Sequence, residues 1–107
     1  MGIPQSENAD PMTIDEFRAL RADDAPAGLS GALFALLQDA KGDWSGAHES
    51  AQRDDSPGGA WVHGYLHRKE GEPGNAAYWY RCAGRPLPTC SLEAEWGLIA
   101  GELLRGD

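Results

Sequence analysis

Three histidines are the residues of this chain best suited to chemistry. His63 and His67 lie four positions apart, which places both rings on one face of an α-helix, and His48 precedes them. Glu70 follows His67 by three positions, and Glu49 adjoins His48. Imidazole nitrogens with a carboxylate form a ligand set that suits Zn²⁺ or Ni²⁺. The spacing predicts a metal site at His63, His67 and His48, although the protease motif His-Glu-x-x-His is absent.

The same residue types also fit a protein core. A buried imidazole can stay neutral and form hydrogen bonds with the backbone, with Asn75 or with a tyrosine. Under this second interpretation His63 and His67 are structural, and no metal is bound. The sequence leaves both interpretations open.

A basic and aromatic segment lies inside an acidic chain. The 107 residues include 9 basic and 17 acidic side chains, which give a net charge of −8. Residues 57–90 instead hold four basic and two acidic side chains, with five of the nine aromatic ones. Cations beside aromatic rings bind carboxylates through charge-assisted hydrogen bonds and stacking. We therefore expect this segment to recognise an acidic partner, whereas the overall charge excludes general attraction to nucleic acid or anionic membranes.

The remaining motifs exclude several other classes of protein. The glycines form no phosphate-binding loop. Cys82 and Cys90 are eight positions apart across a proline-rich segment, which fits free thiols better than a redox pair or a metal knuckle. No apolar run has the length of a secretory signal or a membrane span. We expect a cytoplasmic, non-catalytic protein with no cofactor besides a Zn²⁺ or Ni²⁺ ion at the histidines.

Helix signals divide the chain into short elements. Caps such as Thr13, Ser56 and Ser91 precede apolar residues at helical spacing, glycines follow them, and strand-like alternation is missing. The sequence therefore predicts an all-α single domain over residues 12–107, preceded by a disordered leader over residues 1–11. The expected helices cover about 13–22, 29–41, 44–53, 57–70, 73–83 and 91–105.

A shift of 29 residues aligns two parts of the chain with each other. The shift places apolar residues on apolar or aromatic ones, and it places Gly42 on Gly71 and Ala47 on Ala76. The pattern predicts two stacked helical hairpins, at about 28–56 and 57–90, with a capping helix at 91–105. An alanine five positions after each glycine indicates a tight crossing of the two helices.

The second hairpin resembles a tetratricopeptide repeat. The matching small, aromatic and terminating residues are Gly64, Gly71, Ala76, Tyr80, Ala83 and Pro88. In this likeness His63 and His67 replace a large aliphatic residue and a tyrosine, and Trp61 stands one place late. The first hairpin matches at Ala35, Gly42 and Ala47, so the resemblance covers about residues 28–90. Residues 60–80 are also similar to a group of short uncharacterised bacterial proteins, a likeness that implies no function.

The resemblance implies a binding surface for proteins or peptides. Such arrays bind extended segments on the concave face of their first helices, which here would present Trp61, Tyr65, Arg68 and Lys69. These side chains suit an acidic or carboxylate-bearing peptide. Two repeats are fewer than the three that such arrays usually need, and a homodimer would supply the missing apolar contact. Alternatively, Arg81 would anchor a small ligand in a pocket with aromatic walls.

The four tryptophans are spaced by 17, 18 and 17 residues, which places one in each of four consecutive helices. This regular spacing predicts a shared aromatic core.

Overall fold

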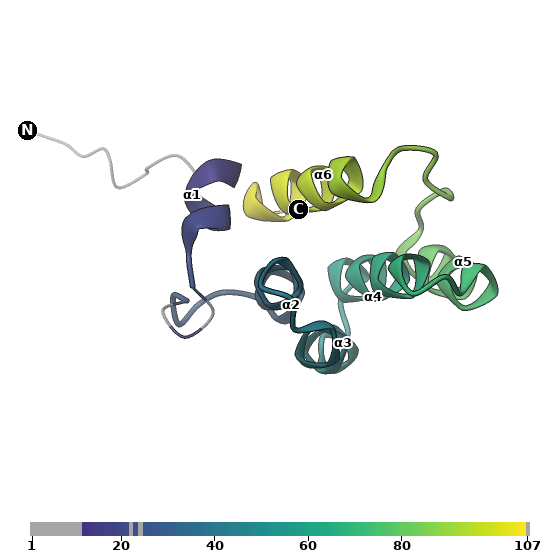
Figure 1. Cartoon of the computed structure of the whole chain (residues 1–107), viewed down its shortest axis with the longest axis horizontal. Coiled ribbons are helices and arrows are strands. Elements are labelled where there is room, and N and C mark those ends of the chain that lie inside the picture. The colour runs from purple at the N-terminus through teal and green to yellow at the C-terminus, as the bar shows by residue number, and fades with distance from the viewer. Residues whose placement is uncertain (1–11, 22, 24, 107) are drawn as a thin grey trace, which may run out of the picture.

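The computed structural model describes residues 12–21, 23 and 25–106, and its regular secondary structure is helical throughout (Figure 1). The helices are α1 Ile14–Ala19, α2 Gly31–Ala40, α3 Trp44–Arg53, α4 Pro57–Lys69, α5 Pro73–Ala83 and α6 Leu92–Leu104. The predicted all-α class is confirmed. The leader expected over residues 1–11 lies outside the described residues.

Side-chain caps set where most of these helices begin. The capping oxygens belong to Thr13, Ser30, Asp43, Ser56 and Ser91. Each accepts a hydrogen bond from a backbone N–H of the first turn, which otherwise has no partner inside the helix. Because Ser30 is a cap, α2 begins later than the sequence predicts. Helix α1 is also shorter than predicted, since Leu20 already has extended backbone.

Equivalent glycines end α2 and α4. Gly42 has φ +89° and Gly71 has φ +79°, a left-handed conformation that residues with a Cβ atom adopt at a cost. Each glycine lets the chain reverse and begin the next helix within a few residues. Gly42 and Gly71, which the shift of 29 residues aligns, therefore occupy equivalent turns after α2 and α4.

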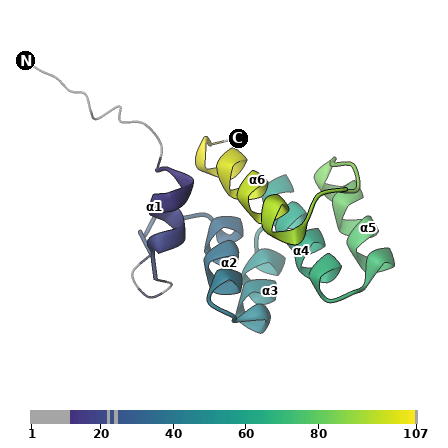
Figure 2. The same cartoon turned by 45° about the horizontal axis from the view of Figure 1, so that its top comes forward.

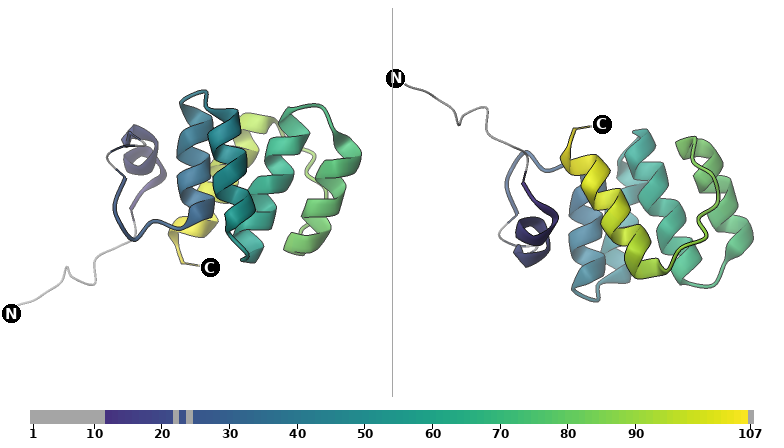
Figure 3. Two further views of the ribbon diagram at one scale, coloured as in Figure 1. Left: turned by 90° about the horizontal axis from the view of Figure 1, so that it is seen from below. Right: turned by 90° about the horizontal axis from the view of Figure 1, so that it is seen from above.

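Consecutive helices lie side by side. Helix α2 packs on α3, α4 packs on α5, and α3 joins the two pairs through α4 (Figure 2). Helix α6 crosses one face of this row and contacts α2 and α4, while α1 packs at the end of the row against α2 and α6 (Figure 3). Helix α4 thus contacts four other helices.

The crossing of α4 and α5 is tight, as the small residues predict. A Cβ atom on Gly64 would lie 3.3 Å from the carbonyl oxygen of Ala76, which is itself only 3% exposed. The two backbones approach closely because neither residue has a large side chain.

Buried apolar side chains from all six helices form the core, and they include Phe17, Leu36, Leu37, Ala47, Val62, Leu66, Ala76 and Ile99. Each large one contributes about 1.5–3 kcal/mol by leaving water. Trp96 completes the core, since its ring packs 5.7 Å from that of Phe17 and its Nε1–H donates to the carbonyl oxygen of Leu36 at 3.0 Å.

The prediction of one aromatic core shared by all four tryptophans holds only in part. Trp61 and Trp96 belong to the buried core and Trp44 packs against it, but no ring of one contacts another and Trp79 lies outside that group. Trp96 joins α6 to α1 and α2, whereas the Trp61 ring lies 3.7 Å from the guanidinium of Arg85. Trp44 and Trp79 are half-buried, and each of them contacts a histidine. The helices cross at different angles, so equal sequence spacing does not bring these rings to one place.

The start of α4 supplies a test of this packing. A Cβ atom on Gly59 would overlap the backbone carbonyl of Asp54, whereas one on Gly97 of α6 would meet no atom within 4 Å. We expect Gly59→Ala to lower the free energy of unfolding by about 1–3 kcal/mol. The matched control Gly97→Ala should raise it by up to about 1 kcal/mol, because alanine favours helix. Urea unfolding measures both, and equal effects would contradict the packing at Gly59.

Candidate metal centre

Histidines from two helices converge in this fold. His48 comes from α3, and His63 and His67 come from adjacent turns of α4. One ring nitrogen from each lies within 4.8 Å of the others, and the Nε2 atoms of His48 and His63 are 3.0 Å apart. The fold therefore brings together all three histidines that the sequence singles out.

The start of α3 holds His48 in this position. Trp44, the first residue of α3, donates its Nε1–H to the carbonyl oxygen of Leu66 on α4 at 3.0 Å. Its ring stacks on His48 with centroids 5.0 Å apart, and it meets His67 edge-on. One tryptophan thus ties α3 to α4 and orients two of the three imidazoles.

A second tryptophan covers the cluster from α5. The rings of Trp79 and His63 are nearly parallel, with centroids 3.8 Å apart. Stacking on a large indole restricts rotation of the imidazole and shields its face from water. His63 is only 3% exposed and His67 8%, while His48 is half-buried.

A carboxylate holds the third histidine. Nδ1 of His67 lies 2.7 Å from Oε1 of Glu72, just beyond the turn that follows α4. A carboxylate on one ring nitrogen fixes the orientation and tautomer of a metal-binding histidine and leaves the other nitrogen for the ion. Glu72, and not the expected Glu70, is therefore the acidic residue of this cluster.

The sequence could not single out Glu72, because the turn at Gly71 separates it from the helical spacing of the histidines. The alternative core interpretation correctly places His63 and His67 in the interior. Their side-chain hydrogen bonds are however with His48 and Glu72, and not with the backbone, Asn75 or a tyrosine.

The surroundings keep two of the rings neutral near pH 7. Burial lowers the pKa of His63 to about 4, with further lowering by the nearby His48 and His67. Burial and His67 also lower the pKa of His48, against the smaller opposing effects of Glu72 and Glu49. Three imidazoles so close together cannot all carry a proton without strong repulsion.

The residues expected to bind a partner lie elsewhere, and most of them form internal contacts. Trp61 and Tyr65 are 4% and 3% exposed. The guanidinium of Arg68 pairs with Glu95 on α6 at 2.7 Å, and the ammonium of Lys69 pairs with Asp39 on α2 at 2.8 Å. Helix α6 covers the face of α2 and α4 where a peptide was expected, since both helices contact it.

Arg81 is exposed on α5, as Lys69 is at the end of α4. The pocket with aromatic walls is also not assembled as expected. Trp61 stacks against Arg85, whereas Trp79 stacks against His63.

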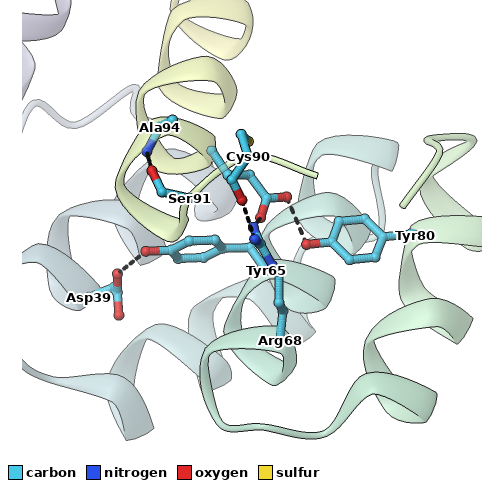
Figure 4. Close-up of polar contacts among 8 residues, drawn as sticks. Asp39, Tyr65, Arg68, Tyr80, Cys90, Ser91 and Ala94 are labelled. Atoms are coloured by element: carbon cyan, nitrogen blue, oxygen red, sulfur yellow. Dashed lines mark hydrogen bonds and ion pairs between the residues drawn. The ribbon is translucent and has the colours of Figure 1, made fainter. Parts of the chain in front are cut away.

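Two buried carboxylates organise the covered face. Glu95, which is 1% exposed, accepts hydrogen bonds from Arg68 and from the hydroxyl of Tyr80, the latter at 2.7 Å. Arg68 also donates to the carbonyl oxygen of Cys90 (Figure 4). Asp39 accepts from the Tyr65 hydroxyl at 3.0 Å (Figure 4).

The tyrosines remain protonated donors, because burial and the adjacent carboxylates raise the pKa of Tyr65 and of Tyr80. Sequence reasoning missed Asp39 and Glu95, because acidic residues on a helix are usually exposed.

Comparison of the chain with protein-family models, with curated proteins and with solved structures found no match in any of the three. Within the described part of the chain, no helix has the length and apolar character needed to cross a membrane.

The lowered histidine pKa values predict how stability depends on pH. Above about pH 6.5, His63 is neutral in both the folded and the unfolded chain. The contribution of the neutral ring to the free energy of unfolding is then fully present. Between about pH 6.5 and 4, only the unfolded chain takes up the proton, and the free energy of unfolding falls by up to about 1.4 kcal/mol per pH unit. Urea unfolding in EDTA measures this slope. His63→Gln should reduce it, and an unchanged slope would contradict the shifted pKa.

The buried carboxylate on α6 supplies a second prediction. Glu95→Ala leaves the Tyr80 hydroxyl without its acceptor and the Arg68 guanidinium without its buried counter-charge, so we expect a loss of about 3 kcal/mol in the free energy of unfolding. Glu93→Ala on the same helix removes an exposed charge and should cost less than about 1 kcal/mol. Thermal unfolding of the two variants measures the contrast. Equal losses of unfolding free energy in the two variants would contradict a stabilising role for the buried contacts of Glu95.

Proposed function

We propose that this protein binds one divalent transition-metal ion through His48, His63 and His67, with Zn²⁺ as the first candidate and Ni²⁺ as the second. The observation that carries the proposal is the convergence of three imidazole nitrogens from α3 and α4. Imidazole donors favour zinc, nickel and copper over magnesium and calcium, which prefer oxygen.

The dimensions of the cluster suit such an ion. Nitrogen ligands around a tetrahedral Zn²⁺ lie roughly 3.3 Å apart, so the widest spacing of 4.8 Å has to close by no more than about 1.5 Å. Each of the three rings has a partner that orients it: Trp44 stacks on His48, Trp79 stacks on His63, and Glu72 lies beside His67. Three oriented ligands that are only half-buried at His48 favour capture of an ion from solvent without rearrangement of the helices.

The tie between His67 and Glu72 adds a specific argument for metal. Hydrogen bonding to Glu72 at Nδ1 leaves Nε2 as the nitrogen of His67 that is available to an ion. Carboxylate–histidine pairs of this kind accompany histidine ligands in zinc sites, and their loss typically weakens metal binding 10- to 100-fold.

A bound ion would link α3 to α4, and so the first pair of helices to the second. Binding to the folded chain alone stabilises it by RT ln(1 + [L]/Kd), or about 2.7 kcal/mol when the free ion is at 100 times its Kd. The proposed role is accordingly that of a metal-binding protein in which the ion also strengthens the fold.

Calorimetric titration of the untagged, chelator-treated protein with Zn²⁺ tests the proposal. We expect one equivalent to bind at pH 7.5 and the melting temperature to rise. His48→Gln, at the most exposed of the three histidines, should abolish binding while the chain stays folded, and Glu72→Gln should weaken it 10- to 100-fold.

The control variant replaces both thiols, Cys82→Ser and Cys90→Ser, and should bind as the natural chain does. Absence of binding to the folded natural chain, or equal binding by His48→Gln, would contradict the proposal.

Binding of an acidic peptide to a tetratricopeptide-like surface stays a prediction of the sequence, as do a cytoplasmic location and a homodimer. The tight packing of Gly64 on Ala76 supports the likeness to such a repeat. Charge reversal at Arg68 is not a clean test of peptide binding, because a carboxylate there would face the buried Glu95 and destabilise the fold.

A further inference from the structure

We infer that the metal ion keeps one coordination position for a small exogenous donor, either water, hydroxide or a small monodentate anion. This inference rests on the proposed metal function and concerns the ligand class of the same site. Structural zinc sites are closed by four protein ligands, whereas sites with three protein ligands leave the fourth position to water or a substrate.

The donor set of the chain supports an open position. Across residues 12–21, 23 and 25–106, the three histidines form the only group of three or more His, Cys, Asp or Glu side chains with donor atoms close enough to share an ion. The group contains no carboxylate and no thiol. A tetrahedral ion held by these nitrogens therefore lacks one protein ligand.

The carboxylates of Glu72 and Glu49, which lie near the histidines in the chain or the fold, contact other groups. Glu72 engages Nδ1 of His67 through Oε1, 2.7 Å away. The Glu49 side chain is 70% exposed and lies 3.8 Å from the guanidinium of Arg53, one turn further along α3. Glu49 also directly follows His48, so the two side chains leave the helix in different directions.

A hollow beside the cluster gives a small molecule room. It has a volume of about 270 Å³ and reaches the cluster at His63, and its other walls include Ala51, Ala60, Trp79, Cys82 and the carboxylates of Asp54 and Asp55. A water molecule occupies about 30 Å³, so the hollow holds several small donors. The two alanines keep the hollow open because they end at Cβ, and the indole of Trp79 gives it an apolar wall.

The charge of the ion itself favours an anion among the small donors, whereas Asp54 and Asp55 in the wall of the hollow disfavour a large or multiply charged one. Three neutral imidazoles leave the two positive charges of the ion uncompensated, and Glu72 is shared with His67. A zinc-bound water in such a site loses its proton near neutral pH, which makes hydroxide a natural occupant. Small monodentate anions compete for the same position.

Titration of the cobalt-loaded protein with azide tests the inference, because four-coordinate Co²⁺ has visible absorption bands that report its ligands. We expect azide to shift these bands saturably, with one azide per cobalt. The same shift should occur in Cys82→Ser and in Glu49→Gln, which remove the thiol that lines the hollow and the carboxylate next to His48 in the chain.

The possible failures are distinguishable. If Co²⁺ does not bind, the proposed metal function itself is wrong. If Co²⁺ binds and azide leaves the bands unchanged, a protein side chain fills the fourth position and the inference is overturned. A thiolate-to-cobalt absorption band that Cys82→Ser removes, or an azide response that only Glu49→Gln gains, would overturn it as well by naming that side chain.

Discussion

Helix α4 is buried along most of its length and still carries polar side chains, and each of these needs a partner inside the protein. A polar group that leaves water without a hydrogen bond costs several kcal/mol. The helix contacts α2, α3, α5 and α6, so every face meets a neighbour. The partners are His48 on α3 for His63, Glu72 for His67, Asp39 on α2 for Tyr65, and Glu95 on α6 for Arg68. These pairs fix how the other helices surround α4.

This constraint also explains why a basic segment exists in so acidic a chain. Three of its four cations pair with acids from other helices: Arg68 with Glu95, Lys69 with Asp39, and Arg85 with Glu102. The local positive charge is thus matched by negative charge across the fold, and Arg81 is the exposed remainder. The charge pattern that predicts a partner-binding surface therefore consists largely of ion pairs between helices of the same chain.

The histidine cluster is the exception among these pairs. Two imidazoles that face each other at 3.0 Å share one proton at best, so His48 and His63 satisfy each other less completely than an acid and a base do. The proposed divalent ion would satisfy all three rings at once, because each neutral imidazole would give it a lone pair. Buried polar groups need partners, and this need explains the ion pairs where α4 faces α6. The same need favours a metal where α4 faces α3.

The sequence by itself determined what depends on neighbours within one helical turn. Caps such as Thr13 and Ser91, the turn glycines Gly42 and Gly71, and the shared face of His63 and His67 are local, and each follows from spacing alone. Only the tertiary structure decided that His48 joins that face, that Glu72 supports it, and which side chains α6 covers. Those contacts join different helices or cross a turn, and the packing angles that create them depend on all the helices together.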